Sequence, residues 1–275
     1  MTKQTPPFRH DRAEGEAETQ GRTVSLAAVR DSVVARALAQ VDHRPWPMPA
    51  RRWVWQQSWQ DLCFLHFEAG AAELRTRLPR GLELDLFDGK AWVGIVPFRM
   101  AETTRRGLPT FAPLSDFPEL NVRTYVTAGG KPGVWFYSLD AGNRLAVWLG
   151  RSLFHLPYRH AQFHLNESDG ACDYRMNGPG VEFAATYTPL EPAPSVAGSF
   201  EHWATERYCL YCADQQGALW RAEVQHPKWP LQRAKATVQR NTVSSLKLGP
   251  QHPAVLFSKR IDVVVWPLER VEQGA

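Results

Sequence analysis

Alternating and continuous runs of apolar residues follow one another along most of the chain, and they predict many strands and few helices. The Asp88-Gly89 pair between two such runs is a strong hairpin signal. Short helices are predicted at 70–78, 143–154 and 199–205. Strand-like runs cover residues 59–68, 82–86, 90–100, 118–127, 133–139, 159–166, 171–176, 180–188, 206–213, 217–224, 233–241 and 255–266. This pattern favours a closed or nearly closed β structure, since closure removes exposed strand edges.

The chain before these strands has a different pattern. Residues 1–22 are polar and show no periodicity, so we expect a disordered tail. Apolar residues at helical spacing predict a helix over 25–40, followed by a Pro-rich connector at 45–49. The expected organisation is therefore a tail (1–22), a helix with its connector (23–50) and one β domain (51–270). Within that domain, residues 101–117 are predicted to form a long loop.

Composition narrows the classes of partner and compartment. The net charge is +4, and the 32 basic and 28 acidic residues are interleaved, so we expect no nucleic-acid partner. No apolar run reaches the length of a membrane span, and the first residues lack an apolar signal core. We therefore expect a cytoplasmic protein without membrane association. Cys209 and Cys212 form a C-x-x-C, a motif that can be redox-active or can ligate a metal. This segment is predicted to be a strand, however, where the two sulfurs would point to opposite faces, so we expect neither function.

One predicted strand carries an unusual polar face. Alternation along 118–126 places Glu119, Asn121, Arg123 and Tyr125 on one side and apolar residues on the other. An ordinary half-exposed strand would have the same pattern. The neighbouring runs are apolar on both faces, however, and a buried Glu beside a buried Arg must be paired or contact a ligand. We therefore predict an internal small-molecule site lined by this face.

Several of these runs resemble the YqjF-like family of bacterial proteins of uncharacterised function. The similar segments include Glu119-Leu-Asn-Val-Arg-Thr-Tyr-Val126 and the runs at 82–98, 132–140, 205–211 and 262–268, in the expected order. The family looks like a distant branch of the acetoacetate decarboxylase-like superfamily. The resemblance implies a mostly β fold, with a few peripheral helices: a β-barrel with a surrounding sheet and an internal cavity.

The resemblance also implies that the decarboxylase nucleophile is missing. Gly150-Arg151-Ser152 followed by Pro157-Tyr158-Arg159 is similar to the segment that carries two lysines in the decarboxylases. Tyr158 then stands at the Schiff-base lysine and Arg159 at the second lysine, while Glu119 matches a retained acid and Gly94 a lost one. A phenol cannot form an imine, so a Schiff-base decarboxylase is excluded unless Lys259 reaches the site.

These observations define a candidate site. Glu119 and Tyr158 are the expected catalytic pair, and the expected ligand-binding residues are Asn121, Arg123, Tyr125, Arg151 and Arg159. Arginines favour a small anionic ligand, and the hypothesis is non-covalent acid–base chemistry, by a lyase or isomerase, on a small oxo or enol carboxylic acid. The alternative is a binding or sensor protein without catalysis. His155, His160 and His164 are thin evidence for a metal, so we expect no metal or cofactor, and homo-oligomerisation is left open.

Overall fold

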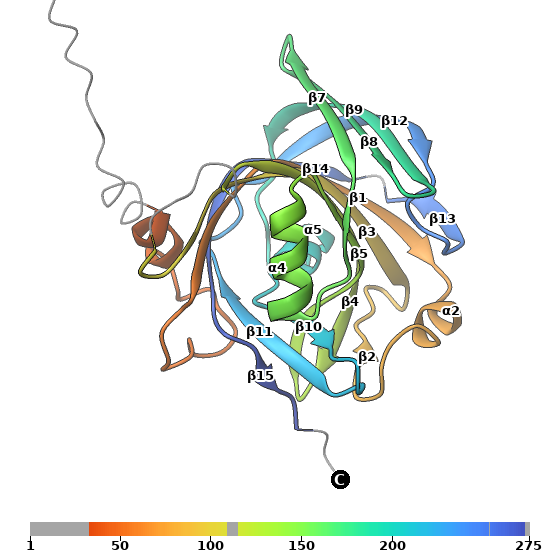
Figure 1. Cartoon of the computed structure of the whole chain (residues 1–275). Coiled ribbons are helices and arrows are strands. Elements are labelled where there is room, and N and C mark those ends of the chain that lie inside the picture. The colour runs from red at the N-terminus through yellow and green to blue at the C-terminus, as the bar shows by residue number, and fades with distance from the viewer. Residues whose placement is uncertain (1–32, 109–114, 253, 273–275) are drawn as a thin grey trace, which may run out of the picture.

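Seven strands close into a ring in the computed structural model, which describes residues 33–108, 115–252 and 254–272 (Figure 1). The ring closes where the last strand pairs back onto the first, as in Trp55 opposite Val265. All of its pairings are antiparallel except the one between β5 and β10. In order around the ring, the strands are β1 (Trp55–Ala69), β3 (Ala91–Arg105), β4 (Phe117–Ala128), β5 (Lys131–Ala141), β10 (Cys209–Ala213), β11 (Leu219–Gln225) and β14 (Val255–Val265).

A second set of strands covers one outer side of the ring (Figure 1). It branches from β14 in the order β12 (Gln232–Asn241), β9 (Val181–Pro192), β8 (Ala171–Gly178) and β7 (Gln162–Ser168). Short strands extend the ring: β13 (Leu248–Gln251) pairs with β1, β6 (Tyr158–His160) with β5, β2 (Glu83–Leu84) with β4 and β15 (Glu269–Arg270) with β11. Outward residues such as Leu65 and Ile95 pack with Tyr174 and Phe183 of this second set. The ring strands beneath this second set are thus buried on both faces, which explains their continuous apolar runs.

Three helices lie wholly within the described residues: α2 (Ala71–Arg75), α4 (Arg144–Phe154) and α5 (Phe200–Thr205). Helix α4 lies across the opening of the ring in Figure 1. The side chain of Asn143 caps it by accepting hydrogen bonds from the backbone N–H groups of Leu145 and Ala146, at 2.9 and 3.0 Å. His155 ends it in the left-handed conformation, with φ of 52°. The chain then turns back into β6 beside β5.

The predicted fold class, mostly β with few helices, is confirmed. The predicted loop at 101–117 is wrong at both ends: residues 101–105 continue β3 and residue 117 begins β4. The polar composition of this stretch suggested a loop. Pairing of β3 with β1, with Arg105 opposite Trp55, holds it in the sheet instead. The run at 159–166 is two strands, because the chain leaves the ring near Ala161. The strands β13 and β15 were not expected.

The segment before the ring packs against it. Residues 33–38 are helical, and Val33 and Ala37 are fully buried. Ala37 lies in a cluster with Val264 and Trp266. Residues 25–32 of the predicted helix and the predicted tail at 1–22 fall outside the described residues, whereas residues 39–40 are described and are not helical. No helix among the described residues is both long and apolar enough to cross a membrane.

Candidate functional site

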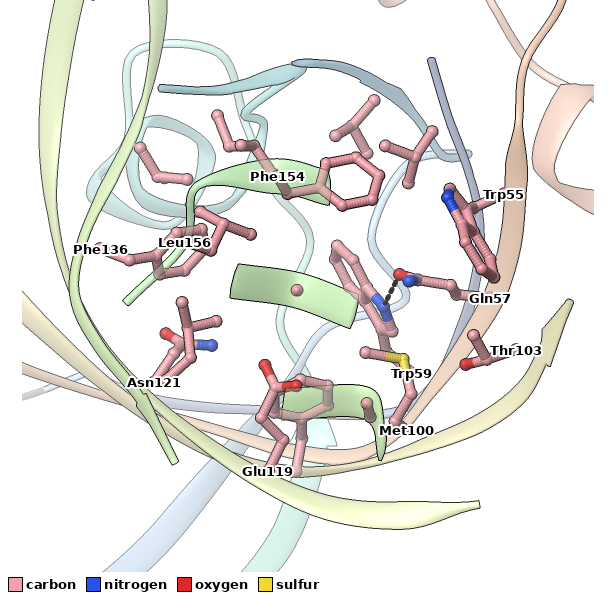
Figure 2. A pocket seen from close by; sticks show the side chains of 18 of the residues that line it. Trp55, Gln57, Trp59, Met100, Thr103, Glu119, Asn121, Phe136, Phe154 and Leu156 are labelled. Carbon is pink, nitrogen blue, oxygen red and sulfur yellow. Dashed lines mark hydrogen bonds between the residues drawn. The ribbon is translucent and has the colours of Figure 1, made fainter. Parts of the chain in front are cut away.

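A cavity of about 400 Å³ lies inside the ring (Figure 2). Its walls are mainly aromatic and aliphatic, and helix α4 contributes Leu149 and Phe154 at one side. Because side chains alternate along a strand, every second residue of β1 and β4 faces inward. These inward residues are Trp55, Gln57 and Trp59 of β1 and Glu119, Asn121 and Arg123 of β4. With Tyr158 of β6, the structure therefore brings four of the predicted site residues to one cavity.

Glu119 and Tyr158 are joined by a hydrogen bond at the wall of the cavity. The Tyr158 hydroxyl donates to Oε2 of Glu119 at 3.0 Å, and Glu119 is 2% exposed. Burial raises the pKa of Glu119 to about 8; the Tyr158 hydrogen bond opposes this rise and the charge of Asp140 adds to it. Burial also raises the pKa of Tyr158 well above its usual value. Glu119 is therefore mostly protonated at neutral pH, and its carboxyl group points into the cavity (Figure 2).

Gly150 of α4 makes room for the Tyr158 ring. A methyl group at residue 150 would lie 2.5 Å from Cε2 of that ring, closer than any real contact. The helix can thus pass directly over the tyrosine. This close approach gives a physical reason for a glycine eight residues before Tyr158.

The two arginines near this pair do not reach the cavity lining. Arg159 alternates away from Tyr158 and forms a two-point ion pair with Asp140, Nε to Oδ1 at 2.9 Å and Nη2 to Oδ2 at 2.7 Å. Asp140 is completely buried, so this pair fixes β6 on β5. Arg151 is exposed on α4 and is absent from the lining.

A cationic pole of the cavity is formed instead by Arg123 and Arg207. Arg123 has no carboxylate partner among the described residues; its Nη2 makes two 3.4 Å contacts, to Tyr125 Oη and the Ala204 carbonyl, and its Nε has none. Arg207 donates from Nη1 to Asp85 at 2.5 Å and from Nε to the Trp203 carbonyl at 2.6 Å, and its Nη2 has no partner in the described part of the chain. Both residues line the cavity.

Tyr125 supports this pole but lies behind the cavity wall. It is fully buried, and its hydroxyl lies 2.5 Å from Nε2 of His66. Its ring packs on Trp203 at 4.3 Å between centroids, because helix α5 fills this end of the ring. The Arg123 and Arg207 guanidinium carbons lie 5.6 and 4.9 Å from the centre of its ring. Asn121, nearer the middle of β4, has an unpartnered Oδ1.

Sequence reasoning missed Arg207, His226 and Trp229, which also line the cavity. Arg207 stands just before the apolar strand β10, so a charge at the border of a buried run was the available signal. Nothing local marked His226 or Trp229, since both follow the end of β11 and reach the cavity only through the ring closure.

The other candidate chemistries lie elsewhere. Lys259 is 61% exposed, and its Nζ lies 2.7 Å from Asp61 and 3.2 Å from Glu167. The hydrogen bond to Asp61 is the main cause that raises the pKa of Lys259, the opposite of what an amine nucleophile needs. Cys209 and Cys212 are free thiols in different hydrophobic clusters. His155, His160 and His164 form no ligand group with three close donor atoms in the described part of the chain.

Comparisons with known proteins agree with this fold. The model of the family DUF2071, described as an uncharacterized conserved protein, matches residues 56–262. The uncharacterized protein YqjF of Bacillus subtilis (strain 168) is 38% identical over 230 residues, which cover 81% of this chain and 95% of YqjF.

Solved structures with the same fold are much more distant in sequence. The acetoacetate decarboxylase of Legionella pneumophila gives a TM-score of 0.61 at 13% identity, over 84% of this chain and 93% of that one. The enduracididine biosynthesis enzyme MppR complexed with pyruvate gives 0.60 at 12% identity, over 84% of this chain and 94% of that one. At these identities the similarity shows the fold alone.

Proposed function

This chain belongs to the DUF2071 family of uncharacterized conserved proteins, and from that premise we propose that it catalyses non-covalent acid–base chemistry on a small oxo or enol carboxylic acid. The observation that carries the proposal is the buried Glu119 carboxyl, which points into the cavity with the Tyr158 hydroxyl as its hydrogen-bond partner. A carboxyl group whose pKa is about 8 holds its proton at neutral pH and can pass it to a bound molecule.

Tyr158 has a defined part in this chemistry. Its hydroxyl already donates to Oε2 of Glu119, so the acidic proton of Glu119 belongs on Oε1. When that proton moves to a carbonyl oxygen or to carbon, the same hydrogen bond stabilises the carboxylate that remains. Tyr158 therefore positions Glu119 and stabilises its charged form.

Arg123 supports the choice of an anionic ligand. Its guanidinium faces the cavity without a carboxylate partner among the described residues. A ligand carboxylate would supply that partner, and Nη2 of Arg207 is a second free donor nearby. The fold relative MppR is described as complexed with pyruvate, which is an oxo acid.

The spacing along β4 also indicates the size of the ligand. Residues 119 and 123 are four positions apart on one strand, so their backbones are separated by about 13 Å. An acid held at Arg123 therefore needs an extended body to reach Glu119. The apolar walls between these poles favour a hydrocarbon or aromatic body, with Asn121 halfway along it.

The mechanism uses no imine. Tyr158 cannot form one, and Lys259 is exposed and paired with two carboxylates. Covalent capture by borohydride in the presence of an oxo acid should therefore leave the mass of the protein unchanged.

A binding or sensor protein is the second candidate. The unpartnered Arg123 and the apolar cavity are sufficient to hold an anionic ligand without any reaction. The two functions differ in what Glu119 does: a sensor needs the cavity and Arg123, whereas an enzyme also needs the proton on Glu119.

The test is a series of oxo acids in which the carbonyl lies progressively farther from the carboxylate, scored for thermal stabilisation and for exchange, in D₂O by NMR, of the protons next to the carbonyl. Wild type is expected to be stabilised by the longer acids and to accelerate exchange. Arg123→Met should lose both effects, and Glu119→Gln should keep binding but lose exchange. Arg175→Met, an exposed arginine on β8, is the matched control.

Two outcomes would contradict the proposed mechanism. Exchange at the wild-type rate in Glu119→Gln would remove Glu119 from the mechanism. Stabilisation by the acids without any exchange in wild type would leave the sensor function.

A further inference from the structure

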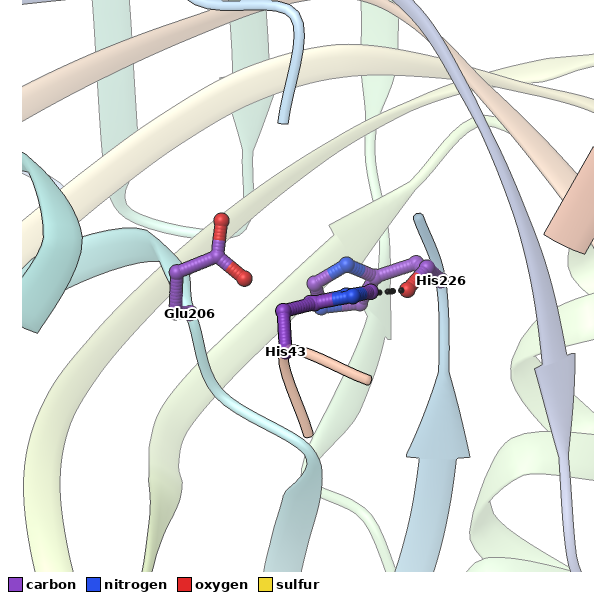
Figure 3. Close-up of side chains that lie close together, drawn as sticks. All are labelled: His43, Glu206 and His226. Atoms are coloured by element: carbon purple, nitrogen blue, oxygen red, sulfur yellow. Dashed lines mark hydrogen bonds between the residues drawn. The ribbon is translucent and has the colours of Figure 1, made fainter. Parts of the chain in front are cut away.

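We propose that His43, Glu206 and His226 form a binding site for a divalent transition-metal ion, with Zn²⁺ as the ion that this donor set fits best. Each residue offers one ligand atom, and the three atoms lie within 4.8 Å of one another. Figure 3 shows the Glu206 carboxylate directed at the two imidazole rings. The proposal is independent of the acid–base chemistry at Glu119.

The three ligands come from segments that the fold holds firmly together. Glu206 directly follows α5, and His226 directly follows β11. His43 precedes Arg44, whose buried guanidinium pairs with Glu223 and donates to the Val224 carbonyl at 2.5 Å. His43 itself contacts the His226 carbonyl through Nε2 at 3.1 Å. The segment before the ring is thus anchored on β11, and it brings one imidazole to the other two groups.

The hydrogen bonding of His226 points to a cation. Its Nδ1 lies 2.7 Å from the Pro227 carbonyl oxygen and its Nε2 lies 3.3 Å from the Arg207 carbonyl oxygen. A neutral imidazole has only one N–H, so only one of these two nitrogens can donate a hydrogen bond. The other nitrogen faces a carbonyl oxygen with its lone pair, and the two do not form a hydrogen bond. The shorter contact assigns the hydrogen to Nδ1, which leaves the lone pair on Nε2. The side chain is 1% exposed, so no bulk water can satisfy this nitrogen.

Two further features agree with metal ligation. Metal-bound histidines usually donate their other N–H to a carbonyl or carboxylate, as Nδ1 does here to Pro227. Glu206 likewise accepts hydrogen bonds from the Tyr208 hydroxyl and the Trp229 backbone N–H. Around a bound metal ion, these two hydrogen bonds would hold the Glu206 carboxylate in the direction of the ion.

Two imidazoles and one carboxylate are a donor set typical of zinc sites that keep a fourth position open. Bonds of about 2 Å require the three atoms to draw closer, and His43 and Glu206 are only half-buried and can rotate inward. His226 also lines the cavity. The site therefore adjoins the cavity at the end that carries Arg207.

The experiment is a Zn²⁺ titration of the tag-free full chain after removal of metals with a chelator, followed by calorimetry. Co²⁺ added in place of Zn²⁺ reports the ligand geometry through its visible absorption. One ion per chain is expected, with a rise in melting temperature. His43→Ala and Glu206→Gln should each weaken Zn²⁺ binding by about tenfold or more. His155→Ala and Glu201→Gln are matched controls outside the cluster and should bind as wild type does.

The proposal is overturned if neither ion binds, or if both cluster variants bind with wild-type affinity. A doubly protonated His226, seen by ¹⁵N NMR in a chain that binds no metal, would also overturn it, because the proton would then satisfy Nε2. Glu119→Gln should bind Zn²⁺ normally, which keeps this result separate from that of the proposed function.

Discussion

Two glutamates on the same ring of strands are buried equally deeply but have opposite surroundings. Glu119 on β4 is 2% exposed and Glu223 on β11 is 1% exposed. The Glu223 carboxylate pairs with Arg44 and with Lys131 Nζ at 2.6 Å, and it accepts from Trp46 Nε1 at 2.7 Å. Among the residues that the structure describes, the Glu119 carboxyl accepts a hydrogen bond only from the Tyr158 hydroxyl. Burial acts to raise the pKa of both, but the partners of Glu223 outweigh it and the pKa of Glu223 is lowered.

This difference separates a structural acid from a candidate catalytic one. A buried carboxylate with matched cations stays charged and ties its neighbours together. A buried carboxyl without a cationic partner keeps its proton. Burying such a group costs free energy, and a purely structural role does not require it. The partners therefore decide the charge of each residue, and burial by itself does not.

The largest expected effect is the loss of the charge at Glu223. Glu223→Gln leaves the buried Arg44 guanidinium without its counter-ion, and we expect it to lower the free energy of unfolding by about 3–5 kcal/mol at pH 7. Urea denaturation measures this loss, with Glu83→Gln, an exposed glutamate on β2, as the control. A loss no larger than that of the control would show that the two buried glutamates do not differ.

The next effect is on the pH dependence of stability. The pKa of Glu119 is higher in the folded chain, about 8, than in the unfolded chain, so the folded state binds the extra proton between pH 4.5 and 8. The contribution of Glu119 to the free energy of unfolding is therefore fully present below pH 4.5. As the pH rises to 8, this contribution falls by up to about 1.4 kcal/mol per pH unit. Glu119→Gln should remove this slope in urea titrations at each pH.

The opposite sign is expected for Glu223. Its folded pKa is lowered, so its contribution is present above the unfolded value and is lost as pH falls through the folded value. The two residues therefore act in separate pH windows. A wild-type slope between pH 4.5 and 8 that survives in Glu119→Gln would contradict the assignment.

A smaller effect is expected from removing the partner of Glu119. Tyr158→Phe takes away the hydroxyl that favours the carboxylate, so the pKa of Glu119 should rise further. We expect a loss of about 1.5–3 kcal/mol at pH 9, where Glu119 is ionised, and less at pH 6, where it is protonated. Urea denaturation at the two pH values tests this, and equal losses would mean that Tyr158 acts only through packing.

The smallest effect is expected from one partner of Glu223. Lys131 is 29% exposed, and Arg44 and Trp46 remain beside the carboxylate when it is changed. Lys131→Met should therefore cost about 1 kcal/mol or less in the same denaturation assay. A loss as large as that of Glu223→Gln would show that Lys131, and not Arg44, compensates the buried charge.

The sequence could predict properties that depend on neighbours along the chain. Alternation with a period of two placed Glu119, Asn121 and Arg123 on one face of β4, and all three line the cavity. Most strands and the positions of α4 and α5 were also predicted, because they depend on local patterns. The tyrosine at 158 argued against an imine only if Lys259 stays out of the site, and the structure places Lys259 at an exposed position.

The tertiary structure decided which residues share a space. It put Arg207 at the cavity in place of Arg151 and Arg159, and it hid Tyr125 behind α5 although alternation placed it with Glu119. It also brought His43 to Glu206 and His226 across most of the chain. The physical reason is that side-chain direction is a local property of a strand, whereas ring closure and the element that covers each face depend on contacts between distant segments.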